Sequence, residues 1–340
     1  MALSTKQGGI LGVPNPTSNG GNIVYSKTST GCHTTQPGTA AISVLVVAGG
    51  GGGGGGNCPG GGAGAGGAFI TENISVSGGT AYPVVIGGGG SGANSNPVSG
   101  GKGTPTTFGA SNPAINLVAT GGGGGGGYTA PGGNPGGLDG GSGGGSGGDV
   151  STGFGNGIAG QGFPGGGVAG PPGAGYQTSG GGGGSEAGHS GGNVIGDPQW
   201  GSGGAGLDVT PVFGAAPQPF YLSNSANTGT VSNGIFAGGG AGAIYACQPN
   251  PGNYAKGGPG GGGRGGTPAP GPGGEPGFPA ITNSGGGGGG PGDWPGANNN
   301  ARPGGSGGSG IVLIKELSRA AGVFRLKEQY DARKQNSWPS

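Results

Sequence analysis

The sequence has few charges and no long apolar run, and both shortages exclude classes of protein. Charged residues make up 7% of the 340 residues, and the formal net charge is +1. Nucleic-acid binding rests largely on an excess of Lys and Arg, which this chain lacks. No apolar stretch approaches the length of a membrane-spanning helix, and the residues after Met1 show no signal-peptide pattern. We therefore expect neither a nucleic-acid partner nor membrane insertion.

Cysteine and histidine are also scarce. Cys32, Cys58 and Cys247 have no CxxC spacing, and His33 and His189 are the only histidines. Cys32, His33 and Cys58 lack the spacing of a zinc finger, so we expect no metal site. The acidic residues are scattered, and the G-x-S-x-G and G-x-G-x-x-G matches follow from glycine-rich composition alone. The sequence thus predicts no catalytic residue, no cofactor and no enzyme, while the redox state of the three cysteines stays open.

Glycine, in contrast, is abundant: the chain has 108 Gly and 29 Pro. After the apolar residues 44–48, eight consecutive glycines follow at 49–56. Such a tract is either a flexible tether or a structural element made of bare backbone. Ordering each glycine costs roughly 0.5–1 kcal/mol more than ordering alanine, and backbone hydrogen bonds at about 1 kcal/mol each can offset that cost. Because the low charge provides no self-repulsion to hold the chain open, we favour glycine as building material.

Short apolar or alternating segments predict strands between the glycine tracts. In residues 68–77, for example, Ile70, Ile74 and Val76 alternate with polar residues, as in a half-buried strand. The predicted strands are residues 22–26, 42–48, 68–77, 81–86, 114–120, 229–246 and 310–317. The strand at 310–317 comes so late that it is best explained if it rejoins the first cluster in a small β-sandwich.

The glycine tracts themselves are predicted to form a polyglycine-II helical bundle. Gly and Pro exclude the α-helix, and the tracts lack β-forming residues. What remains is the polyproline-II conformation, whose backbone groups need partners from neighbouring segments. The fold class is therefore all-β with irregular structure: a small β-sandwich base, a polyglycine-II bundle and a short C-terminal helix. Residues 1–40 form an attachment segment, 41–317 the glycine-rich domain (base 41–120 and 305–317, excursions 121–304), and 318–340 a docking segment.

Two groups of residues are candidates for contacts with partners. Tyr128, Trp200 and Trp294 stand beside Asn, Asp or Gly at expected loop tips, where an aromatic side chain either contacts a receptor or caps the end of the bundle. In the C-terminal segment, Val323, Leu326 and Tyr330 form an apolar stripe on a short helix. Together with Trp338, these residues either pack on their own domain or dock on a neighbouring protein.

Several segments resemble the glycine-rich domain of bacteriophage tail-fibre and other virion appendage proteins. These are "SVLVVAGGGGGGGG", "ISVSGGTAYPVVIGGGGSG", "GGKGTPTTFG" with "LVATGGGGGGG", and "GGSGGSGIVLIKEL". The likeness covers roughly residues 42–317, and the tail "GVFRLKEQYDARKQNSWP" is similar to closing segments of marine phage structural proteins. No long fibre shaft is present, and the tip residues match no known receptor pattern.

The resemblance implies a virion structural protein that is assembled in the host cytoplasm. The expected partners are further copies of the chain in a homotrimer, other virion proteins, and a host-surface glycan or outer-membrane protein. One alternative is a capsid decoration or vertex fibre protein that binds no receptor. A second is an ice-binding or matrix protein, although no Thr/Ala face recurs every three residues.

Overall fold

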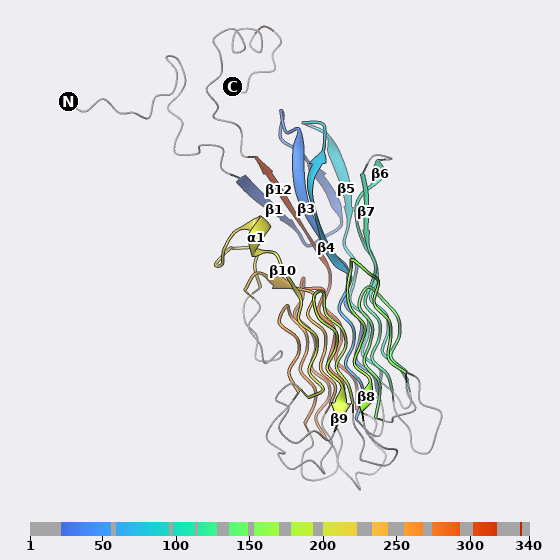
Figure 1. Cartoon of the computed structure of the whole chain (residues 1–340). Coiled ribbons are helices and arrows are strands. Elements are labelled where there is room, and N and C mark those ends of the chain that lie inside the picture. Colours follow the sequence, from blue (N-terminus) through green and yellow to red (C-terminus); the bar gives the residue numbers. More distant parts are fainter. Residues whose placement is uncertain are drawn as a thin grey trace, which may run out of the picture.

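The computed structural model describes residues 22–55, 59–94, 98–112, 115–127, 136–148, 153–169, 178–192, 200–222, 233–243, 255–267, 274–292, 302–317 and 334. Figure 1 shows two regions, a group of β-strands and, beyond them, a stack of extended segments. The described part is therefore all-β with much irregular structure. The helix α1 (Thr210–Phe213) in the described part is a single turn of four residues.

Two four-stranded antiparallel sheets form the first region. The first sheet has the order β1-β12-β3-β4 and the second has the order β2-β5-β6-β7. The strands of the first sheet are β1 (Asn22–Lys27), β3 (Ala41–Val47), β4 (Ala68–Ser75) and β12 (Ile311–Leu317). Those of the second are β2 (Gly31–Thr34), β5 (Ala81–Val85), β6 (Thr106–Asn112) and β7 (Ile115–Ala119). The late strand does rejoin the first cluster, because β12 pairs with both β1 and β3.

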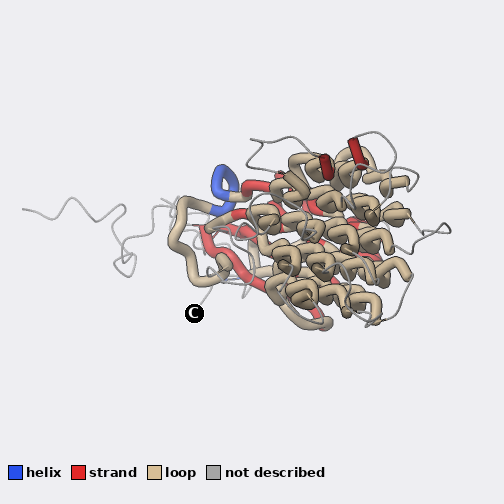
Figure 2. The backbone as a smooth tube through the Cα atoms, turned by 90° about the horizontal axis from the view of Figure 1, so that it is seen from below, coloured by secondary structure: helices blue, strands red, loops and turns tan. Residues whose placement is uncertain are grey.

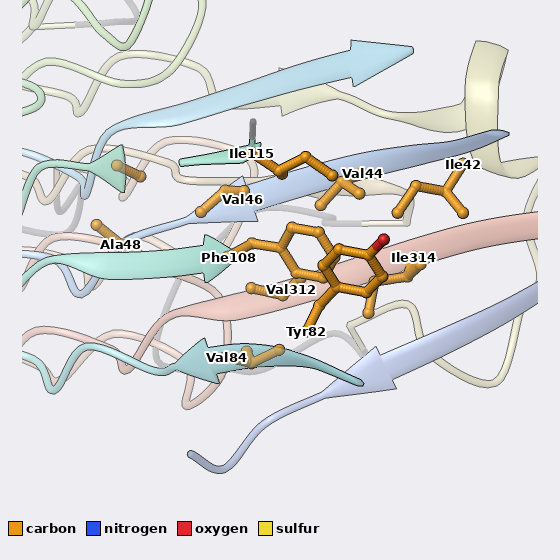
Figure 3. Packing of buried hydrophobic residues seen from close by; sticks show 11 residues of the cluster. Ile42, Val44, Val46, Ala48, Tyr82, Val84, Phe108, Ile115, Val312 and Ile314 are labelled. Carbon is orange, nitrogen blue, oxygen red and sulfur yellow. The ribbon is translucent and has the colours of Figure 1, made fainter. Parts of the chain in front are cut away.

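The sheets pack face to face over an apolar core, which Figure 3 shows. Val44 and Ile314 of the first sheet belong to one buried cluster with Val84 of the second. At its centre the rings of Tyr82 and Phe108 stack, with 5.9 Å between their centroids. This burial explains why the inward positions of β5 are apolar while Ala81 and Val85 of the same strand are exposed.

The opposite face of the first sheet is covered by an insertion between residues 207 and 236. It contains β10 (Leu207–Asp208), α1 and β11 (Ile235–Phe236), and it buries Phe213 and Phe236 in one cluster with Leu45 and Leu313. Lys315 Nζ donates a hydrogen bond to the carbonyl of Val212 at 2.6 Å. With both faces covered, β3 carries the continuous apolar run Val44–Val47 that the sequence shows.

The segment 229–246, predicted to supply further strand, does so over only two of the described residues 233–243. Only Ile235 and Phe236 form a strand there, since "AGGGAG" continues as an extended glycine segment. The strands β2 and β6 were not predicted, because "GCHT" and "TTFGASN" lack an apolar alternation. Strands β1 and β2 lie within the predicted attachment segment 1–40 and belong to the two sheets.

The second region consists of glycine-rich extended segments, here called the rods. They run between a sheet end and a far end, and Figure 2 views them nearly end on, standing in rows. The rods are residues 49–55, 60–67, 87–94, 98–104, 121–127, 136–141, 142–148, 153–158, 162–167, 178–184, 185–190, 200–206, 237–243, 255–260, 261–267, 274–281, 285–292 and 302–309. Two short strands, β8 (Val168–Ala169) and β9 (Gly191–Gly192), extend two of them at the far end.

Backbone hydrogen bonds join the rods with a period of three residues. In the rod 49–55, every third N–H group donates to the same neighbouring rod, so that three neighbours are reached in turn. The pairs are Gly49 to Thr104 and Gly52 to Gly101, Gly50 to Gly308 and Gly53 to Gly305, and Gly51 to Gly64 and Gly54 to Gly61, at 2.8–3.2 Å. The glycines are therefore structural material and not a tether.

This packing leaves room for only the smallest side chains inside the bundle. A Cβ atom added to Gly124 would lie 1.9 Å from the carbonyl oxygen of Gly100, far inside van der Waals contact. Where a buried rod position is not glycine, the residue is small. Ser146 and Ser179, for example, are fully buried, and their hydroxyl groups lie 3.1 Å apart in a hydrogen bond.

Candidate functional site

The far end of the rods is the first candidate site, because the sequences that connect rod ends there contain more of the larger polar and aromatic residues than the rods do. Most rods that reach this end are followed by a connection that contains Pro, Asn or an aromatic residue. The longer of these connections are residues 128–135, 149–152, 170–177, 193–199, 244–254, 268–273 and 293–301. All of them lie outside the described residues, and so do the predicted contacts Tyr128 and Trp294.

Trp200 is the one predicted tip residue that the structure describes. It opens the rod 200–206 at the far end, is partly buried, and packs against the buried residues Ala241 and Ala255. Its indole Nε1 is buried and has no hydrogen-bond partner within the described residues. The ring thus packs on two neighbouring rods at the far end.

A charged cluster that the sequence analysis did not predict also lies at the far end of the rods. It is formed by residues on either side of the connection 268–273. The guanidinium of Arg264 lies over the ring of Phe278, 3.4 Å from its centroid, and its Nη1 lies 3.2 Å from Glu275 Oε2. Thr267 Oγ1 donates to the same carboxylate oxygen at 2.8 Å. Burial alone would raise the pKa of Glu275, but the hydrogen bonds from Thr267 and Arg264 hold that pKa below its usual value. The cluster braces two adjacent rods.

The opposite end of the molecule is where the two terminal segments join the fold. Asn22, the first residue of β1, is paired with Leu317, the last residue of β12. Residues 1–21 and 318–340 are therefore connected to the same end of the same sheet. The predicted docking residues Val323, Leu326, Tyr330 and Trp338 and the predicted C-terminal helix lie outside the described residues.

His33 and Glu316 form a buried pair between the two sheets. Their Nε2 and Oε1 atoms lie 3.2 Å apart, and the two side chains are 3% and 0% exposed. Glu316 Oε2 accepts hydrogen bonds from Thr39 Oγ1 at 2.8 Å and from the Gln36 N–H at 3.1 Å. Burial lowers the pKa of His33, and this effect outweighs the opposing influence of Glu316. His33 is therefore neutral at pH 7 beside a hydrogen-bonded carboxyl group.

No cluster of three or more metal-ligating side chains occurs among the described residues. Cys32 carries a free, exposed thiol, whereas its neighbour His33 is buried. Adjacent strand residues point to opposite faces, so the two side chains diverge. Cys58 and Cys247 lie outside the described part.

The comparison with protein families decides the membership of the chain. A family model described as a glycine-rich domain matches residues 26–316. The chain belongs to this glycine-rich domain family. The match begins inside β1 and ends inside β12, so the glycine-rich domain comprises both sheets, the insertion and all the rods.

No curated protein matches the chain. Within the described residues of this glycine-rich domain protein, no helix is long and apolar enough to cross a membrane.

Proposed function

We propose that this glycine-rich domain protein is a bacteriophage virion component, a tail fibre or tail-associated appendage that presents its far-end connections to a host surface. The observation that carries the proposal is the opposite placement of two features. Both terminal segments join the fold at the end of the β1–β12 pair, whereas the described rod ends that flank the longer connections lie at the far end. A chain held to a particle through its terminal segments would therefore project the far end outward.

We also propose that the rods are polyglycine-II helices. Support for this assignment comes from the three-residue period of the hydrogen bonds, since the polyglycine-II helix has three residues per turn and no internal hydrogen bonds. Its outward-pointing backbone groups then bond to neighbouring rods in three directions, which matches the partners of Gly49, Gly50 and Gly51. A bundle cross-linked in this way would be a stiff body that holds the connections in fixed positions.

The proposed partners follow from this polarity. Other virion proteins would bind at the sheet end, where residues 318–340 carry the apolar stripe of Val323, Leu326 and Tyr330. A host-surface glycan or outer-membrane protein would bind at the far end, near Trp200. Self-assembly into a homotrimer and assembly into the virion in the host cytoplasm complete the proposal, which includes no cofactor and no catalytic role.

Localisation on the particle tests the virion role. Phage particles that carry this chain would be imaged by cryo-electron microscopy, with gold-labelled antibodies against the chain to mark its position. We expect label at the tail or fibre, with the rods pointing away from the particle. Label spread over the capsid lattice would contradict the attachment role and support the alternative of a capsid decoration protein. Particles without label would overturn the virion assignment.

Binding by the isolated protein tests the attachment role separately. The purified chain would be incubated with cells of the host, and bound protein would be measured against cells of a strain that resists the phage. Saturable binding to the susceptible cells alone supports the proposal, and equal binding to both strains contradicts it.

A further inference from the structure

The exposed large apolar side chains of the described residues gather mainly on one side of the molecule. Five of them, each between 40% and 45% exposed, make up what is here called the apolar flank: Val85, Val118, Phe154, Ile158 and Phe163. They come from the second sheet and from the rods 153–158 and 162–167. In Figure 1, β6, β7 and the green rods that follow them occupy this side.

The upper part of the flank is a row across the outer face of the second sheet. Val85 of β5 pairs in register with Thr107 of β6, and Thr107 pairs with Val118 of β7. These three residues alternate with the buried core positions Val84 and Phe108, so they share the outward face. The equivalent face of the first sheet is covered by the insertion at 207–236, whereas Val85 and Val118 remain exposed.

The lower part of the flank adjoins this row directly. Gln161, in the turn between the two rods, donates its Nε2 hydrogen to the carbonyl of Val118 at 3.3 Å. The two rods lie side by side, because the N–H of Gly165 donates to the carbonyl of Gly155 at 3.0 Å. A Cβ atom on Gly167 would lie 3.2 Å from the ring of Phe154, which places that ring against the second rod.

Two backbone donors of the rod 153–158 have no partner among the described residues. The N–H groups of Gly155 and Ile158 donate inward, to the carbonyls of Gly144 and Gly141 at 2.8 and 3.0 Å. Phe154 and Gly157 precede them by one residue each, and their N–H groups make no hydrogen bond among the described residues. Given the period of three, both donors point in one direction away from the bundle. In interior rods, the equivalent N–H groups donate to carbonyl groups of a neighbouring rod.

The flank carries almost no charge. The segments β5, β6, β7 and 153–167 contain no Asp, Glu, Lys or Arg. Asp139 lies on an adjoining rod, and its Oδ1 already accepts the N–H of Asn156 at 2.6 Å. A neutral apolar surface of this kind can meet a copy of itself without like-charge repulsion.

We propose that the apolar flank binds another copy of this chain. Phe154, Ile158 and Phe163 pack against the partner copy and form the centre of the interface. The N–H groups of Phe154 and Gly157 donate to carbonyls of the partner's rods, in the same way that interior rods are joined. The inference names the surface for the self-assembly proposed above and does not depend on host attachment.

Sedimentation velocity of the full chain over a wide range of protein concentrations tests the inference. We expect a discrete species of two or three chains for the wild type. The triple variant Phe154→Ser, Ile158→Ser, Phe163→Ser should be monomeric, and Phe154→Ser alone should weaken association by about 30-fold or more, as for a central interface residue. The matched control is Ile23→Ser, which changes an exposed apolar residue of β1 that lies outside the flank and should leave the mass unchanged.

A monomeric wild type at all concentrations would overturn the inference, as would association that persists unchanged in a folded triple variant. Amide hydrogen exchange of the wild type is a second test. It uses no variant, so its result does not depend on whether the triple variant folds. The amides of Phe154 and Gly157 should gain protection as the chain associates, and unchanged exchange in the associated species would exclude this surface. A monomer that still binds host cells would refute the inference while leaving the attachment role intact.

Discussion

His33 and Glu316 lie 3.2 Å apart between the two sheets, and both side chains are almost entirely removed from solvent. The pair connects β2 of the second sheet with β12 of the first, positions 283 residues apart in the numbering of the chain. Neither Nε2 of His33 nor Oε1 of Glu316 makes a well-aligned hydrogen bond within the described residues. Burial is the largest influence on His33 and lowers its pKa in the fold, despite the neighbouring carboxyl group of Glu316, which raises it.

Stability should therefore depend on pH through His33. Because the pKa of His33 is lower in the folded state than its ordinary value of 6.5, the unfolded chain binds the proton first as the pH falls. The free energy of unfolding should be constant above about pH 7. It should decrease as the pH falls below the ordinary histidine value and level off below the folded pKa. Urea unfolding at a series of pH values measures this decrease.

The control for the pH experiment is a pair of single variants. His33→Gln should abolish the decrease, whereas His189→Gln, at a partly exposed position, should retain it. A decrease that is equally large in His33→Gln would assign the effect to another group.

Gly124 and Gly88 should respond to alanine in opposite directions. At Gly124 the new methyl group would collide with the carbonyl of Gly100, so Gly124→Ala should destabilise the fold by about 3 kcal/mol or more. At Gly88, also in a rod, the nearest atom to a Cβ is Thr104 Oγ1 at 3.9 Å. Gly88→Ala should stabilise by about 0.4–1 kcal/mol, because it restricts the unfolded chain. Equal unfolding free energies for the two variants, measured in denaturant, would contradict close backbone packing.

Two adjacent threonines of β6 should also differ under one substitution. Thr106 Oγ1 accepts the N–H of Gly87 at 2.9 Å in a buried site, so Thr106→Val should cost about 1–3 kcal/mol by leaving that donor unpaired. Thr107 Oγ1 is buried and has no partner among the described residues. Thr107→Val should be neutral or stabilising by about 1 kcal/mol, since it removes an unsatisfied hydroxyl group. Thermal unfolding of both variants at one protein concentration compares them, and a lower melting temperature for Thr107→Val than for Thr106→Val would refute the assignment.

Trp200 allows capping to be separated from receptor contact. Trp200→Phe keeps an aromatic ring on Ala241 and Ala255 but removes the N–H group that has no partner in the described structure. Stability should therefore change by less than about 1 kcal/mol, whereas Trp200→Ala should lose about 1 kcal/mol or more. If the partly exposed indole ring contacts a receptor, Trp200→Phe should weaken binding to host cells at unchanged stability. Unchanged binding by both variants would leave Trp200 with the capping role alone.

The sequence by itself determined six of the strands and the role of glycine. The apolar runs and alternations placed β1, β3, β4, β5, β7 and β12 within a few residues of their observed bounds, because a strand's side-chain period is local. The late position of residues 310–317 was enough to predict that this strand returns to the first cluster, as its pairing with β3 confirms. The low charge and high glycine content pointed to ordered backbone and against a tether.

Only the tertiary structure decided which segments meet. One glycine tract looks like another in sequence, so the pairing of Gly49 with Thr104 or of Gly50 with Gly308 follows from the connections and the packing of the whole bundle. The pairing of His33 with Glu316 was equally hidden, since it depends on the order of strands in two different sheets. The apolar flank joins strands to rods that are separate in the chain. Contacts of this kind arise from the arrangement of backbones in space, which no local pattern of residues encodes.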